Sequence, residues 1–268
     1  RTQLTADQLQ KPGIAAGQVD NAFFAPIEPA GEVQHGLAVS ISIPQTQMQS
    51  NQPGIKVNGK AIDVFPAAIL QPPFFNINAD PAVNYGAIGG VIGHEIGHGF
   101  DDQGSKSDGN GVLRNWWTSE DNAAFVAKTD ALVGQYNAFC PLDNGEACIN
   151  GRLGLGENTG DLGGLSMAYK AYKMSLDVDG DGVISKSEEA PIIDGVTGDQ
   201  GLFMAWAQVW RTKYREESLR QQLIRGPHSP PYYRVNGIVR NFDEWYEAFD
   251  IGPDHALYLP PEERIRIW

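Results

Sequence analysis

The chain has 268 residues, of which 41% are hydrophobic and 20% charged, so it can bury a sizeable core as a globular protein. Its formal net charge of -13 argues against nucleic acid and anionic membrane surfaces as partners. No apolar run reaches the roughly 18 residues of a membrane-spanning helix. We therefore expect no membrane segment in this chain.

Residues 1–63 form an N-terminal segment of unclear role, because no motif in it indicates chemistry. Residues 37–43 alternate in polarity as a strand does. Two short apolar runs, at 55–57 and 61–64, are separated by Asn58-Gly59, which is typical of a two-residue hairpin turn. A β-hairpin is expected at 55–64.

The central motif of the sequence is His94-Glu-x-x-His98, the pattern of zinc peptidases. Asp80-Pro81 provides an N-cap and a first residue for a helix that leads into the motif. Positions four apart share one face of a helix, so both histidines can bind one metal ion, with Glu95 beside them. The alternative is a pair of unrelated histidines on a buried, glycine-rich helix.

A second acidic motif supplies further candidate metal-site residues. Glu157 and Asp161 lie four residues apart on a helix that is expected to continue to Met174. A catalytic zinc site needs a third protein ligand, and Glu157 can provide it. Asp161, and Asp101 three residues beyond His98, can accept the second ring N–H of a ligand histidine. Alone, each carboxylate is also typical of a solvated helix face or end.

Two longer helices are expected elsewhere. One covers residues 119–136. The other covers 201–224 as a single long helix that ends at Gly226-Pro227. Its apolar stripe consists of Leu202, Trp206, Val209, Trp210 and Leu223.

Residues 177–188 fit the twelve-residue calcium loop of an EF-hand. The candidate calcium ligands at its alternate positions are Asp177, Asp179, Asp181, Val183, Ser185 and Glu188. Gly182 allows the sharp turn that such a loop needs. Pro191 follows closely, so the exiting helix is short or missing, and an acidic solvated loop is the alternative. Bound calcium would brace an insertion and take no part in catalysis.

Two cysteines, Cys140 and Cys148, flank a short polar loop. This spacing suits a local disulfide, whereas two free thiols are the alternative. A disulfide would indicate an oxidising compartment, so we expect a periplasmic or extracellular protein.

Four separated motifs together resemble the neprilysin family of zinc metallopeptidases, which includes endothelin-converting enzymes and bacterial oligopeptidases. In chain order they are Tyr85 to Asp102, Trp116-Trp117-Thr118, Gly156-Glu-Asn-x-x-Asp161-x-Gly-Gly164 and His228-Ser-Pro-x-x-x-Arg234-Val-Asn-Gly237. The resemblance covers residues 64–268, as a catalytic domain. It implies an α+β, mainly helical fold of the zincin-like (thermolysin-like) type with a small β-sheet.

The resemblance also implies the metal site. The zinc ligands would be His94, His98 and Glu157, and the carboxylates that orient the ligand histidines would be Asp161 and Asp101. Zinc would be the cofactor, with calcium as a candidate second ion at 177–188.

The catalytic roles follow from the same resemblance. Glu95 would be the general base, His228 would stabilise the oxyanion of the transition state, and Arg234 would bind a substrate carbonyl or carboxylate. Gly226-Pro227 precedes His228 where family members often carry an acidic residue.

The expected function is that of a zinc metalloendopeptidase that hydrolyses oligopeptides. Family members are much longer and have a helical N-terminal part that covers the active site, so we expect a covering domain to be missing from this chain. Two alternatives stay open: a zinc-binding but inactive protein, and a calcium-binding surface module.

Overall fold

The computed structural model describes residues 22–23, 39–41, 55–57, 60–65, 67–109 and 112–267. Within these ranges the chain is mainly helical. The rest of the 1–63 segment, which includes parts of the strand expected at 37–43, lies outside the described residues.

Four short strands form an antiparallel sheet with the order β1-β2-β4-β3. They are β1 (Ala22–Phe23), β2 (Val39–Ile41), β3 (Ile55–Val57) and β4 (Lys60–Phe65). Val57 lies opposite Lys60, so the β3–β4 connection is the Asn58-Gly59 dipeptide.

The helical part begins with α2 (Pro81–Asn84), a π-helical turn η2 (Tyr85–Gly89) and α3 (Gly90–Gly97), which follow one another without a break. The other α-helices are α4 (Ser119–Asn137), α5 (Leu155–Leu176), α6 (Gly198–Val209), α7 (Glu216–Arg225), α8 (Pro231–Val239) and α9 (Asp243–Phe249). Short 3-10 turns are η1 (Ala67–Ile69), η3 (His98–Phe100), η4 (Gly104–Lys106), η5 (Asp143–Gly145) and η6 (Pro261–Glu263). No helix in the described ranges has both the length and the apolar character to cross a bilayer.

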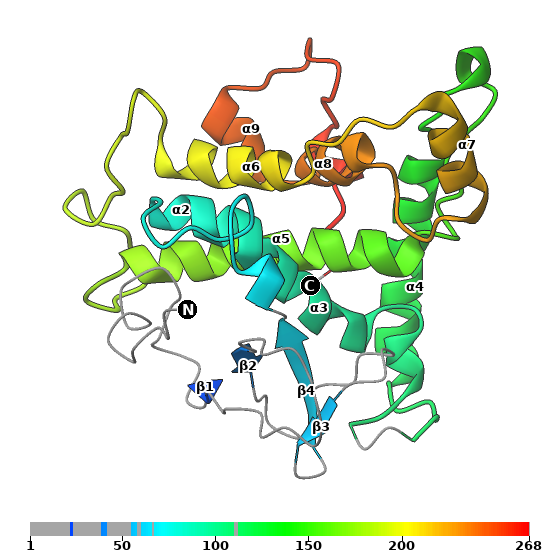
Figure 1. The fold of residues 1–268 in the computed structure, drawn as a ribbon, viewed down its shortest axis with the longest axis horizontal. Helices are drawn as coiled ribbons and strands as arrows, with labels where there is room; N and C mark the ends of the chain where they lie inside the picture. Colours follow the sequence, from blue (N-terminus) through cyan, green and yellow to red (C-terminus); the bar gives the residue numbers. More distant parts are fainter. Residues whose placement is uncertain are drawn as a thin grey trace.

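The longest helix, α5, runs across the centre of the molecule (Figure 1). α3 and η2 pack against it, and α6 covers α2 and η2. In the view of Figure 1 the strands lie on one side of α5, and α6, α8 and α9 lie on the other. The α3–α5 pair therefore lies between the sheet and helices α6, α8 and α9 in this view.

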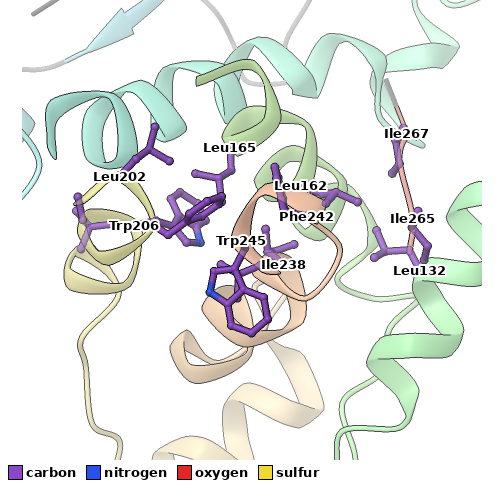
Figure 2. Close-up of a cluster of buried hydrophobic side chains, with 14 of the residues drawn as sticks. Leu132, Leu162, Leu165, Leu202, Trp206, Ile238, Phe242, Trp245, Ile265 and Ile267 are labelled. Atoms are coloured by element: carbon purple, nitrogen blue, oxygen red, sulfur yellow. The ribbon is translucent and has the colours of Figure 1, made fainter. Parts of the chain in front are cut away.

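The main hydrophobic core lies between α5, α6, α8 and α9 (Figure 2). Leu165 from α5, Leu202 and Trp206 from α6, and Ile238 from α8 are each 0% exposed. Side chains that are this completely buried contribute roughly 1.5–3 kcal/mol each. Leu132 and the C-terminal Ile265 and Ile267 extend the cluster towards α4 (Figure 2). The core thus fixes α5 from several directions.

The expected single helix over 201–224 is wrong, because α6 ends at Val209 and α7 begins at Glu216. The buried part of the apolar stripe ends where α6 ends. Leu202, Trp206 and Val209 are buried, but α7 contains no buried residue. Residues 211–215 are polar except for Tyr214 and exposed, so the packing that stabilises α6 ends before them. Most helical stability in proteins comes from such packing.

Candidate active site

The helix that carries the histidine motif begins as the sequence predicts. Asp80 is its N-cap and accepts a 2.9 Å hydrogen bond from the N–H of Ala82, while Pro81 is the first helical residue. The helix then passes through the π-helical turn η2 before α3 starts. Such turns are rare and are frequently found at functional sites. Nothing in the sequence pattern pointed to this one.

Close contact between α3 and α5 sets the position of the two motifs. A Cβ on Gly93 would lie 2.6 Å from the carbonyl oxygen of Gly164, so only glycine fits at this crossing. A Cβ on Gly160 would lie 2.9 Å from Nδ1 of His94. The glycines thus let the backbone of α5 form the wall against which the His94 ring rests.

Three side chains converge at this crossing, and they are the three predicted zinc ligands. Glu157 Oε2 lies 3.2 Å from His94 Nε2, and Glu157 Oε1 lies 3.9 Å from His98 Nε2. One ligand atom from each of the three residues lies within 4.8 Å of the others. Two imidazole nitrogens and one carboxylate form the donor set of a catalytic zinc site, which leaves a position for water. The residues present therefore fit the metal.

Each histidine of the pair is oriented by a carboxylate. Nδ1 of His94 is 2.8 Å from Asp161 Oδ1, and Nδ1 of His98 is 2.8 Å from Asp101 Oδ2. A carboxylate accepts hydrogen bonds, so it holds the ring proton on Nδ1 and leaves Nε2 free to bind a metal. Both orienting contacts predicted from the spacing are therefore present.

The two orienting carboxylates are themselves held in place. Asp101 accepts hydrogen bonds from the backbone N–H groups of Gln103 and Gly104, at 2.8 and 2.7 Å. Asp161 is 0% exposed and receives two hydrogen bonds from Arg234, at 2.7 Å from Nε and 2.6 Å from Nη2. Burial alone would raise the pKa of Asp161, but the charge and hydrogen bonds of Arg234 outweigh it and lower that pKa. Asp161 is therefore a buried anion.

Arg234 is buried at the back of the site. Its guanidinium lies 3.8 Å from the ring centre of Trp210, and its backbone carbonyl accepts a 3.2 Å hydrogen bond from Nε1 of Trp206. The predicted contact of Arg234 with substrate is not tested by these contacts, which instead place the side chain on Asp161. Trp210 was expected only as a core residue. It lies 24 positions before Arg234 in the sequence, so no local pattern predicted that the two side chains would stack.

Charge coupling within the cluster is strong in the absence of a metal. Burial lowers the pKa of His94, but Asp161 and Glu157 outweigh it and raise that pKa to about 9. Burial raises the pKa of Glu157, but the nearby His228 and His94 outweigh it and bring that pKa well below its ordinary value. At neutral pH the metal-free site thus holds a proton on His94, which a metal ion has to displace.

His228 and Glu95 complete the predicted catalytic set. His228 has a side chain that is 48% exposed, and its Nε2 lies 2.9 Å from Glu157 Oε2. The loop that ends at α8 therefore brings His228 to the rim of the ligand cluster. Glu95 follows His94 on α3 and is partly buried. Their roles as oxyanion stabiliser and general base stay predictions.

The predicted calcium loop lies in an exposed connection between α5 and α6. Asp177, Asp179 and Glu188 have carboxylate oxygens within 4.8 Å of one another. Hydrogen bonds from Ser185 lower the pKa of Glu188 to about 2. Of the other predicted ligands, Asp181 accepts a hydrogen bond from the N–H of Val183, whose side chain is exposed. Three of the six predicted ligands converge, and calcium binding stays a prediction.

The two cysteines form the predicted disulfide, Cys140–Cys148. It closes the loop that follows α4 and contains η5. Within that loop Asp143 forms a two-pronged ion pair with Arg220 of α7, at 2.6 and 2.7 Å. This ion pair therefore links the disulfide loop to α7.

Comparison with known proteins shows the family to which the chain belongs. A model of peptidase family M13 matches residues 57–265, so the chain belongs to peptidase family M13. Among its relatives, the neutral endopeptidase of Lactobacillus helveticus is 39% identical over 204 residues, which are 76% of this chain and 28% of that protein. Endothelin-converting enzyme 1 of Cavia porcellus is 40% identical over 205 residues, which are 76% of this chain and 26% of that protein.

Solved structures give the same result. The inhibitor complex of the zinc metalloprotease Zmp1 of Mycobacterium tuberculosis is 53% identical, with a TM-score of 0.71, over 76% of this chain and 31% of that one. The PepO structure from Lactobacillus rhamnosis is 36% identical, with a TM-score of 0.63, over 76% and 29%. The chain spans about a quarter to a third of the length of these relatives.

Proposed function

We propose that this chain is the catalytic region of a zinc-dependent endopeptidase that hydrolyses oligopeptides. The observation that carries the proposal is the convergence of His94, His98 and Glu157, with each histidine held by its own carboxylate. Membership of peptidase family M13 supports it. The zincin-like (thermolysin-like) type of fold is part of the same proposal.

The proposed chemistry assigns roles to the metal and to two residues, Glu95 and His228. When bound by the three ligands, zinc would supply a Lewis acid that lowers the pKa of water and polarises a carbonyl. Glu95 would accept the proton of the attacking water and then donate it to the leaving amine. His228, at the rim, would donate a hydrogen bond to the oxyanion that forms at the scissile carbonyl.

Arg234 has a more restricted part in this proposal than the sequence suggested. Nε and Nη2 both donate to Asp161. We propose that the remaining nitrogen, Nη1, is the group that binds a substrate oxygen. The main task of Arg234 would then be to keep Asp161 charged and correctly placed behind His94.

The proposal is tested by measuring bound zinc and peptide hydrolysis on the same samples. Purified protein is assayed with a library of quenched fluorescent peptides, with and without a zinc chelator, beside the Glu95→Gln variant. We expect one zinc per chain and chelator-sensitive cleavage. The variant should retain zinc and lose about 10²–10⁴-fold in kcat, as for loss of a general base.

The outcomes also separate the two alternative functions, neither of which the family comparison favours. Bound zinc without cleavage would support an inactive zinc protein. Calcium without zinc would support a calcium-binding surface module. Full activity in Glu95→Gln with zinc bound would overturn the mechanism.

Two secondary proposals follow from features outside the zinc site. The disulfide supports a periplasmic or extracellular location, since disulfides persist in oxidising compartments. The EF-hand-like spacing of residues 177–188 supports calcium binding in a bracing role, separate from catalysis.

A further inference from the structure

The loop that carries His228 is attached to α5 directly beside a metal ligand. Two consecutive residues of α5 contact two consecutive residues of the loop. Oε2 of Glu157 lies 2.9 Å from Nε2 of His228, and Oδ1 of Asn158 accepts a 2.8 Å hydrogen bond from Oγ of Ser229. The second contact is dry, because Asn158 is 1% and Ser229 3% exposed.

The polar character of this second contact has a cost. Nδ2 of Asn158 is buried and lacks a hydrogen-bond partner among the described residues. A buried donor without a partner destabilises a protein, and an apolar side chain would avoid that penalty. Simple packing therefore does not explain an asparagine here. Its hydrogen bond with Ser229 is what distinguishes it from an apolar residue of similar size.

The rest of the loop offers His228 weaker support. The carbonyl of His228 accepts a 2.6 Å hydrogen bond from Nε2 of Gln222, but Gln222 belongs to α7, which contains no buried residue. The imidazole itself is about half exposed. Ser229 follows His228 directly and is buried, so it is the neighbouring residue that holds the backbone beside His228 in place.

The opposite side of the contact is shaped to admit the loop. A Cβ on Gly154 would lie 3.0 Å from the carbonyl of Pro227, 3.3 Å from Nδ2 of Asn158 and 3.5 Å from Oγ of Ser229. The glycine before α5 therefore leaves room for the loop that carries His228. The first turn of α5 and the loop form one closely packed unit around the Asn158–Ser229 bond.

We propose that Ser229 and Asn158 are positioning residues that hold His228 over the ligand cluster, so that its imidazole can stabilise the oxyanion. The proposal rests on the proposed peptidase function and goes beyond it by assigning how His228 is placed. Neither side chain reaches the reacting atoms. Their effect on the reaction is expected to pass entirely through His228.

The test introduces Ser229→Ala into the wild-type protein and into the His228→Ala variant. Each protein is loaded with zinc, and its hydrolysis of one fluorogenic peptide is measured. The control is Ser175→Ala, which removes an exposed hydroxyl near the end of α5, one that donates to the carbonyl of Tyr172. We expect Ser229→Ala to lower kcat about tenfold, with KM within twofold and bound zinc unchanged. In the His228→Ala background the same change should have no further effect, and Ser175→Ala should match wild type.

Three results would overturn the proposal: an unchanged kcat in Ser229→Ala, an equal loss in both backgrounds, or a loss of zinc in step with activity. A second readout does not need activity. In protein labelled with ¹³C at Cε1 of histidine, Ser229→Ala should increase the mobility of the His228 ring and leave His94 and His98 unchanged. If wild type cleaves no peptide, the proposed function fails, and the ring mobility alone decides the positioning role.

Discussion

The zinc-ligand cluster and the calcium-like loop were both predicted from the spacing of candidate metal ligands, but they are supported in different ways. At the zinc cluster, His94 is held by Asp161, and Asp161 is held in turn by Arg234, 73 residues further along the chain. In the loop, the hydrogen bonds that the carboxylates of Asp177 and Glu188 accept all come from residues 178–185. The first site depends on the whole fold, and the second depends on one segment.

The two sites should therefore differ in how well they tolerate substitution of a charged residue. A buried carboxylate whose partner is removed leaves an uncompensated charge in a medium of low dielectric. An exposed carboxylate is solvated by water whether or not its partner is present. Damage at the zinc cluster should therefore affect folding and metal binding together, whereas damage in the loop should stay local.

The largest effect is expected for Asp161→Asn. It leaves the buried Arg234 without its counter-charge, so the free energy of unfolding should fall by about 3–5 kcal/mol. Zinc affinity should fall about 10–100-fold, because Nδ1 of His94 loses its acceptor charge. Urea unfolding and competition with a zinc chelator measure the two effects.

A matched control for that variant is Asp199→Asn. Asp199 pairs with Lys173 at 3.2 Å, but both side chains are about one-third exposed. The loss there should be no more than about 1 kcal/mol, with zinc affinity unchanged. Equal destabilisation by the two variants would contradict the distinction between buried and exposed charges.

The second effect is a pH dependence of zinc binding to the metal-free protein. The pKa of His94 is raised to about 9, so below that pH a zinc ion has to displace its proton. Apparent affinity should rise about tenfold per pH unit between pH 7 and 8.5 for one displaced proton, and level off above pH 9. Calorimetry in two buffers of different ionisation enthalpy measures the protons released. A flat profile over this range would show that His94 is already neutral.

A third effect is expected for Gly160→Ala. The new methyl group would lie 2.9–3.2 Å from the ring of His94, so the ring or α5 has to shift. Overpacking of this kind costs about 1–3 kcal/mol. Zinc affinity should fall about tenfold, as a chelator competition would measure. Gly134→Ala on α4 is the control, since a Cβ there has no neighbour within 4 Å, and it should leave the affinity unchanged.

The smallest effect at the zinc site is expected from the loop. Glu188→Gln removes the charged residue at the last calcium position and should weaken calcium binding in a titration followed by calorimetry. Peptidase activity and zinc content should change by less than about twofold, because the hydrogen bonds of Glu188 lie within its own segment. A large loss of zinc would show that the two regions are coupled.

Much of the zinc site follows from local sequence rules. His94 and His98 share a face because they are four residues apart. Asp80 is the N-cap of the helix that leads to them, and Pro81 is its first residue. Asp101 reaches His98 from three residues away. Each of these relations is contained within one turn or one helix, so spacing alone is sufficient to predict it.

Relations between distant residues could not be predicted in this way. The stacking of Trp210 on Arg234 and the bond between Asn158 and Ser229 depend on how α5, α6 and α8 are packed, which no periodicity encodes. The break between α6 and α7 was missed for a related reason. The polar residues 211–215 are compatible with a helix, and their pattern does not show that the buried part of the apolar stripe ends at Val209.

The contact between Gly93 and Gly164 has a consequence for how the molecule can move. The two backbones meet there without side chains between them, so a slide of α5 along α3 would bring Ile92 or Leu165 into a gap that admits only a hydrogen atom. The two helices can therefore shift only as one rigid body. Any change of shape that accompanies the proposed peptide binding is therefore expected in elements outside this pair, such as the loop that carries the half-exposed His228.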